Sequence, residues 1–216
     1  GFTTGVMDTG LLERAKWISF PHSGEFTIRD LPAFRKEFLP EKEVTSAKLF
    51  SAGCGVYVVW LNGKRLYNTA PEGQKVEYEL KPGFTEQMVR KLYHCYDITD
   101  QLCNGVNCLS AIVGAGWWAD RIVLMKDRFP AFKALLQITY ADGSVQIITT
   151  DETWKVSNAH PVREASIYDG EFYDARYTMA FANQKGGVGK TTSCVNIASC
   201  AAAMGIPAVE RELTKA

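Results

Sequence analysis

Apolar and polar residues alternate along short stretches of this chain, and Gly, Asn and Asp separate these stretches. Such alternation places one face of a strand in a core and the other in solvent. Asn62-Gly63 marks a tight turn, because both central residues of this turn type need a positive φ, and residues 64–67 return as its second strand. The first predicted strands are residues 33–38, 47–52 and 56–61.

The alternation continues downstream with a strand about every ten residues. Asn104-Gly105 and the segment 141–144 supply turns, and residues 114–118 are predicted as a glycine-hinged aromatic loop. Short strands at this spacing are typical of an antiparallel β-sandwich, so the sequence predicts a mainly β fold. The further predicted strands are residues 91–98, 107–113, 133–140, 145–150 and 154–156.

The pattern changes near Thr178, where a strand, a glycine-rich loop and a helix follow one another. We therefore predict three parts. Residues 1–32 are an N-terminal segment that packs on the sandwich and lays Trp17 on a neighbouring surface. Residues 33–178 form the sandwich, and residues 179–216 form a truncated P-loop fragment.

The composition excludes several classes of protein. The 216 residues carry 24 basic and 24 acidic side chains, so the formal net charge is zero. Nucleic-acid binding usually leaves a basic footprint, and none is present. No run of about 18 apolar residues predicts a membrane span. The chain begins at Gly1 without a signal-peptide pattern, which leaves a cytoplasmic or periplasmic location in a bacterium open.

Cysteines and histidines form no metal or catalytic motif. Only Cys103 and Cys108 are close among the cysteines of the β-rich part, and their spacing fits no zinc pattern. We interpret the cysteines as scattered thiols, with a local Cys103–Cys108 disulfide as the alternative. His22, His94 and His160 are far apart in the sequence, and no role is assigned to them.

An acidic cluster near residue 170 is the only dense group of carboxylates. A glycosidase needs two carboxylates across a sugar-sized gap. If Asp169 and Glu171 lie on one strand, they share a face about 7 Å apart. We interpret Asp169, Glu171 and Asp174 as a solvated or interdomain edge that meets Arg176, with catalysis and metal binding as weaker alternatives.

An aromatic group gives the candidate carbohydrate site. Aromatic rings stack on the apolar faces of sugars, while Asp and Arg bond hydroxyl groups. Trp117, Trp118, Asp120 and Arg121 are therefore candidate carbohydrate-binding residues. Alternatively, one Trp closes the sandwich core and the other packs against a neighbouring domain. Trp60 lies in a strand and is predicted to be core.

Residues 1–178 resemble the N-terminal region of bacterial α-L-rhamnosidases. This resemblance implies a galactose-binding-like or jelly-roll β-sandwich ahead of an (α/α) barrel that carries the catalytic carboxylates and is not part of this sequence. The implied partners are that barrel and a rhamnoside or other plant or bacterial glycan. The stretches that carry the resemblance include residues 9–12, 15–18, 34–38, 55–57, 61–65, 114–118, 140–144, 150–155 and 167–176.

Residues 180–198 resemble the deviant Walker A region of ParA/MinD-type partition ATPases. Glycines in such a loop let backbone N–H groups point at phosphate oxygens. The resemblance implies that Lys190 reaches the β and γ phosphates, that Thr191 ligates Mg²⁺ and that Lys185 acts across a dimer. The candidate nucleotide-binding residues are Lys185, Gly186, Gly187, Gly189, Lys190, Thr191 and Thr192.

The ATPase-like part lacks the remainder of its fold. A helix predicted at residues 190–204 is followed by only twelve residues, without a second strand carrying aspartates for Mg²⁺. One strand and one helix bury too little surface to offset their ordering entropy. No cofactor is therefore expected, except Mg-ATP if the fragment is functional.

The sequence thus predicts a non-catalytic accessory domain, carbohydrate-associated or structural, of an α-L-rhamnosidase-like glycoside hydrolase. The alternative is an ATP-binding fragment of a partition-type ATPase.

Overall fold

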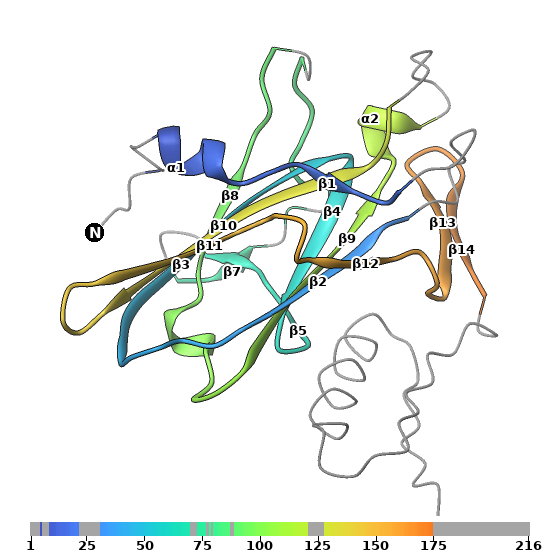
Figure 1. The fold of residues 1–216 in the computed structure, drawn as a ribbon. Coiled ribbons are helices and arrows are strands. Elements are labelled where there is room, and N and C mark those ends of the chain that lie inside the picture. The colour runs from blue at the N-terminus through green and yellow to red at the C-terminus, as the bar shows by residue number, and fades with distance from the viewer. Residues whose placement is uncertain are drawn as a thin grey trace, which may run out of the picture.

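Two antiparallel sheets make up the protein, whose computed structural model describes residues 5, 9–21, 31–69, 73–76, 78, 80–86, 89–120 and 128–174. The chain order is α1 (Thr9–Arg14), β1 (Ile18–Ser19), β2 (Ala33–Phe38), β3 (Val44–Cys54), β4 (Val56–Leu61), β5 (Lys64–Arg65), β6 (Asn68–Thr69), β7 (Lys75–Val76), β8 (His94–Asp97), the 3₁₀ turn η1 (Thr99–Gln101), β9 (Asn107–Gly114), α2 (Gly116–Ala119), β10 (Ala131–Tyr140), β11 (Val145–Thr149), β12 (Lys155–Ser157), β13 (Val162–Ser166) and β14 (Gly170–Tyr173). This arrangement confirms the predicted mainly β sandwich (Figure 1).

The two large sheets each contain five strands. One has the order β1-β10-β3-β8, with β11 also pairing β10, and is called the β10 sheet below. The other has the order β12-β2-β9-β4-β5 and is called the β9 sheet. Two small hairpins, β6–β7 and β13–β14, complete the described strands.

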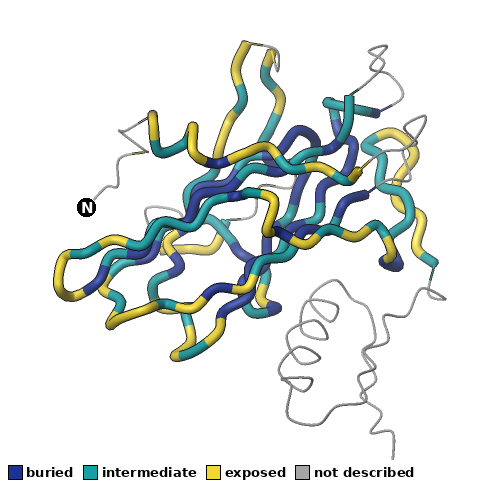
Figure 2. The backbone as a smooth tube through the Cα atoms, viewed as in Figure 1, coloured by how far each residue is buried: buried dark blue, intermediate teal, exposed yellow. Residues whose placement is uncertain are grey.

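The core lies between the facing surfaces of the two sheets, where Figure 2 shows buried backbone in both layers. Alternate residues of β10 face this core, among them Phe132, Leu136 and Ile138, which are all fully or almost fully buried. Trp60 is 6% exposed, so its predicted place in the interior is confirmed. Burying side chains of this size is the main favourable contribution to the stability of the fold.

Local turn chemistry agrees with the prediction at the first hairpin. Asn62 and Gly63 have φ values of 50° and 76°, and β4 pairs β5 directly across them. The Asn62 side chain also accepts a hydrogen bond from the backbone N–H of Cys108 at 2.8 Å. The turn is therefore tied to the neighbouring strand β9 as well as to its own hairpin.

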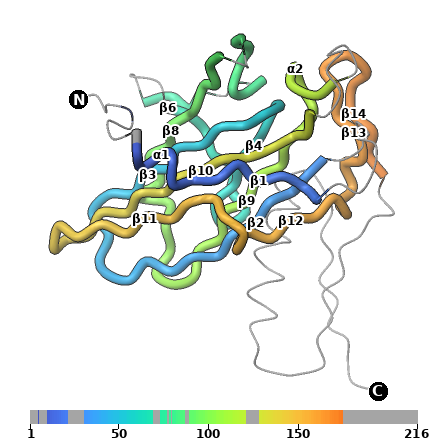
Figure 3. The backbone as a smooth tube through the Cα atoms, turned by 45° about the horizontal axis from the view of Figure 1, so that its top comes forward, coloured from blue at the N-terminus to red at the C-terminus, as the bar shows by residue number. Residues whose placement is uncertain are grey.

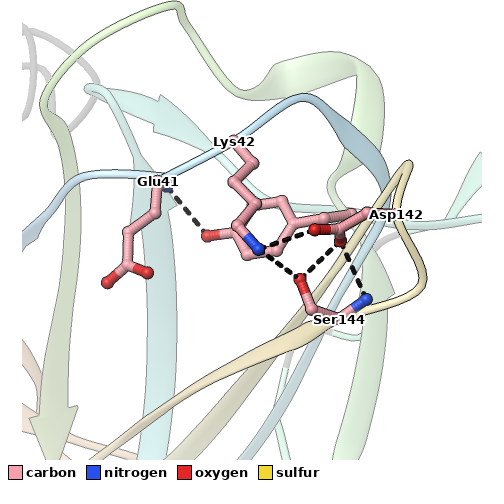
Figure 4. A network of polar contacts seen from close by, with 5 residues as sticks. Glu41, Lys42, Asp142 and Ser144 are labelled. Atoms are coloured by element: carbon pink, nitrogen blue, oxygen red, sulfur yellow. Dashed lines mark hydrogen bonds and ion pairs between the residues drawn. The ribbon is translucent and has the colours of Figure 1, made fainter.

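Polar contacts hold the β10–β11 turn against the segment before β3 (Figure 4). Lys42 Nζ lies 2.6 Å from Asp142 Oδ2 and donates to Ser144 Oγ at 3.0 Å. The backbone N–H of Ser144 donates to Asp142 Oδ1 at 2.9 Å. The hydrogen bond from Lys42 is the largest cause that lowers the pKa of Asp142. Because the pair is half exposed, we expect it to orient the turn and to add little stability.

Several predicted elements differ from the structure. The strand predicted from residue 91 begins only at His94, and the predicted aromatic loop at 114–118 contains the single helical turn α2. The hairpin β13–β14 was not predicted at all. Cys103 and Cys108 are free thiols, so the alternative of a disulfide between them is wrong.

Among the described residues, no helix has the length and apolarity that a bilayer crossing requires.

Candidate functional site

The helical turn α2 places the two predicted sugar-stacking tryptophans next to each other at the end of β9. Gly116 has a φ of +50°, and a Cβ there would lie 2.9 Å from the backbone nitrogen of Val56. Glycine thus allows the chain to leave β9 and turn at once against β4. The turn presents Trp117 and Trp118 to different neighbours.

Trp118 is held by specific contacts. Its indole Nε1 donates to the carbonyl of Phe129 at 3.0 Å. The ring lies under two cations, with Lys91 Nζ 4.9 Å and the Arg128 guanidinium 4.5 Å from its centroid. Such cation–π contacts use the ring face that a sugar would need. Sugar stacking on Trp118 would require both cations to move.

Trp117 and Asp120 lie differently. The Trp117 ring meets Phe84 in an edge contact, with centroids 5.9 Å apart. Asp120 is 1% exposed, below the surface where a sugar hydroxyl would bind. Arg121 lies outside the described residues. The carbohydrate role of these four residues stays a prediction from the sequence.

A cavity of about 140 Å³ lies beside Trp17, on the outer face of the β10 sheet. Trp17 is 40% exposed, and Tyr93 is 41% exposed at the other side of the cavity. Lys91 and Lys133 also line it. The sequence analysis placed Trp17 on a neighbouring surface without identifying this cavity, because the lining residues come from four segments distant in the chain.

The acidic cluster does not form a carboxylate pair on one strand. Asp169 lies in the turn before β14, whereas Glu171 is on β14 and exposed, so the expectation that the two share a strand face is wrong. Asp174 follows the strand, and its backbone N–H donates to Pro161 O at 2.8 Å. Among the described residues, no group of three or more His, Cys, Asp or Glu side chains is placed to hold a metal ion.

The two described histidines are partly or wholly buried. His160 is 2% exposed, and its Nε2 lies 2.8 Å from the carbonyl of Leu31, so Nε2 carries the proton in the neutral ring. Burial lowers the pKa of His160, the Leu31 carbonyl raises it, and Arg163 lowers it further. Burial also lowers the pKa of His94, and Lys81 acts in the same direction.

Lowering the pH from 7.5 to 5.5 is expected to destabilise the fold. A histidine whose folded pKa lies below its unfolded value binds a proton preferentially in the unfolded chain, so stability falls as pH drops below about 6.5. The slope from His160 is at most about 1.4 kcal/mol per pH unit. Urea unfolding at several pH values measures this slope, and His160→Gln should flatten it. An unchanged slope in this variant would contradict the assignment.

The predicted nucleotide loop, Lys185 to Thr192, lies outside the described residues. The structure therefore gives no geometry for phosphate binding or for Mg²⁺ at Thr191. Nucleotide binding stays a prediction from the sequence.

Comparisons with known proteins agree on one family. A family model described as "Alpha-L-rhamnosidase N-terminal domain" matches residues 42–202. An α-L-rhamnosidase of Alteromonas sp. (strain LOR) is 35% identical over 187 residues, which are 80% of this chain and 20% of that protein. An α-L-rhamnosidase of Streptomyces avermitilis is 35% identical over 151 residues, 68% of this chain and 14% of that protein.

Solved structures show the same relationship. The α-L-rhamnosidase from Dictyoglumus thermophilum superimposes with a TM-score of 0.68 at 28% identity, covering 82% of this chain and 20% of that one. The enzyme from Aspergillus terreus gives a TM-score of 0.64 at 30% identity, covering 80% and 20%. The chain spans about a fifth of the length of these relatives. The resemblance of the sandwich to this family is confirmed, and the chain belongs to the α-L-rhamnosidase N-terminal domain family.

Proposed function

We propose that this chain is a non-catalytic accessory module of an α-L-rhamnosidase-type glycoside hydrolase, and that it docks against the catalytic part of such an enzyme. One observation carries the proposal. Large apolar side chains are exposed together on the connection between β7 and β8 and on the β13–β14 hairpin. We call this set the end patch; it consists of Leu80, Phe84, Val89, Leu92, Tyr168, Phe172 and Tyr173.

The end patch is strongly exposed and spans neighbouring elements. Phe84 is 70% and Val89 is 82% exposed. The ring contact between Phe84 and Trp117 connects the β7–β8 connection to α2. Figure 3 shows α2 beside the β13–β14 hairpin, at the side of the molecule that also carries the β7–β8 connection. Contiguous exposed apolar surface of this kind usually marks an interaction site.

The charged groups support an accessory role rather than catalysis. A glycosidase general acid needs a raised carboxyl pKa. Three described carboxyl groups have clearly shifted pKa values, and all three are lowered: Asp142, Asp151 and Glu152. The first and last of these face lysines at the surface. This electrostatic environment keeps carboxylates charged, which is opposite to what an acid catalyst needs.

Two further roles remain as proposals. Carbohydrate contact through Trp117 and Trp118 would bind a rhamnoside or a related glycan, although cations already lie over the ring of Trp118. The loop at 185–192 favours nucleotide binding as the second candidate function. A melting temperature that rises with Mg-ATP, and no longer does so in Lys190→Ala, would support that second candidate.

Binding of the neutral dye Nile red tests the docking proposal. The wild-type chain should enhance the fluorescence of the dye, and Phe84→Ser/Val89→Ser should remove most of this enhancement. Nile red is uncharged, so lysines near the surface do not attract it. Sedimentation should show that the wild-type chain self-associates more than this variant.

The matched control removes two exposed apolar side chains elsewhere. Leu39 is 53% and Val145 is 49% exposed, and they lie near each other because Gln146 Nε2 donates to Leu39 O. Leu39→Ser/Val145→Ser should leave dye binding unchanged. The docking proposal would be wrong if the two double variants lowered dye binding equally, or if the wild-type chain did not bind the dye.

A further inference from the structure

The cavity beside Trp17 lies in one row across the β10 sheet. Lys133 pairs with Ala52, Ile18 pairs with Phe132, and Ser51 pairs with His94. Extending these registers by one residue places Trp17 next to Lys133, and Tyr93 next to Ala52. Directly paired residues of antiparallel strands point to the same face. The row Trp17, Lys133, Ala52, Tyr93 therefore faces outward, because Phe132 and Ala134 face the core.

Side-chain size explains the hollow. Ala52 is the smallest member of the row, and the larger Trp17 and Tyr93 lie on either side of it. The next row contains Leu135 and Phe50, which pair with each other and are 0% and 5% exposed. Leu12 of α1 also lines the cavity, and Phe50 meets Tyr93 edge-on with ring centroids 6.0 Å apart. The result is an apolar floor between two half-exposed aromatic walls.

The backbone fixes the Trp17 wall in place. The N–H of Lys16 donates to Thr150 O at 2.8 Å, and Thr150 Oγ1 donates to Lys16 O at 2.6 Å. Lys16 itself points to Glu152, with which it forms an ion pair. The neighbouring acidic side chain is therefore engaged away from the cavity. Trp17 is thus held between two anchored residues, Lys16 and Ile18.

Cations gather at this cavity. Lys91 Nζ lies 5.9 Å and Lys133 Nζ 5.8 Å from the ring centroid of Trp17. These distances are at the outer limit of a cation–π contact, so an ammonium group can turn toward an anion at small cost. Among the described residues, no carboxylate forms an ion pair with Lys133. Nearby, Cys54 has its pKa raised to about 11 by burial, while Lys91 and Arg128 act in the opposite direction.

We propose that this cavity binds a hexuronic acid residue of an acidic saccharide, with the sugar ring against Trp17 and Tyr93 and its carboxylate between Lys91 and Lys133. The saccharide part of this proposal rests on the proposed function, because the family is that of a glycoside hydrolase. The cavity is smaller than a pocket for a drug-sized ligand, which suits one ring of a longer chain. A neutral sugar would leave the two ammonium groups without a matching charge.

Nuclear magnetic resonance of the indole groups tests the proposal on the full chain. The five tryptophans give separate indole N–H signals, and Trp17→Phe assigns the signal of Trp17. Methyl β-D-glucuronide should shift the Trp17 signal saturably at millimolar concentration. Methyl β-D-glucoside, which lacks the carboxylate, should not. Raising the salt concentration should weaken the binding of glucuronide, because the lysines are partly solvated.

Charge variants locate the anion. Lys133→Gln should weaken glucuronide binding about tenfold or more, whereas Lys133→Arg should retain most of it. Lys155→Gln removes one exposed charge from β12 and should leave binding unchanged. Lys133→Gln should also leave Nile red binding unchanged, so failure of this site is distinguishable from failure of the docking proposal.

Three results would overturn the proposal. The first is a Trp17 signal that does not move at about 50 mM glucuronide, a concentration far weaker than millimolar binding requires. The second is an equal response to the neutral glucoside, which would show that the lysines play no part. The third is an equal response to cyclohexanecarboxylate, which would show that the cavity recognises an apolar anion and not a sugar.

Discussion

Replacing Phe132 with alanine is expected to lower the free energy of unfolding by about 3 to 5 kcal/mol. Phe132 is 0% exposed on β10 and contacts three aromatic rings. Its ring centroid lies 5.9 Å from that of Phe34, 5.8 Å from that of Tyr57 and 6.0 Å from that of Trp154. Phe34 and Tyr57 belong to the β9 sheet, so this one side chain joins both layers. Its loss leaves a cavity and removes contacts between the sheets.

Urea unfolding followed by circular dichroism measures the effect. Phe172→Ala is the matched control, because it makes the same truncation at a residue that is 55% exposed. A surface truncation of this kind is expected to change stability by less than about 0.5 kcal/mol. If both variants lost the same stability, Phe132 would not be the link between the layers that the ring contacts indicate.

Replacing Gly55 with alanine is expected to destabilise the fold by more than about 2 kcal/mol. Gly55 is the single residue between β3 and β4, and its φ of +121° is a conformation that L side chains rarely adopt. A Cβ at this position would lie 2.1 Å from the carbonyl oxygen of Gly114. That oxygen belongs to the backbone of β9, so it cannot move aside without disturbing the sheet.

Gly143→Ala separates the clash from the backbone strain. Gly143 also has a positive φ, +80°, but nothing lies within 4 Å of a Cβ built there. This variant should lose only about 1 kcal/mol, and the difference between the two midpoints in urea measures the close approach of Gly55 to β9. Equal losses would mean that the contact with Gly114 contributes nothing.

Strong local signals let the sequence predict most of the sandwich. The alternation in β2, β4, β9 and β10 and the Asn62-Gly63 turn depend on neighbours in the chain, so periodicity finds them. The hairpin β13–β14 escaped prediction because all four residues of β14 are exposed, which leaves no alternation to detect. The residue Gly116 was recognised as a hinge, but a four-residue helical turn is too short to have a helical period.

The cavity beside Trp17 could not be predicted from the sequence for a different reason. Its walls depend on the register of four strands, and residues 17 and 133 come together only through the pairing of β1 with β10. A shift of one residue would turn Lys133 into the core. The candidate set at 117–121 was easier to find because its members are adjacent in the sequence, although the structure buries Asp120.

The central place of β10 has a consequence for folding during synthesis. β10 pairs with β3, β11 and β1, and β12 later covers the edge of β2. The ribosome makes β1 more than 100 residues before its partner, which at ordinary elongation rates is a delay on the order of ten seconds. Until residue 140 emerges, β3 lacks its longest partner and exposes an apolar strand of eleven residues. The nascent chain is therefore most exposed to misassociation just before the last third of the sandwich is made.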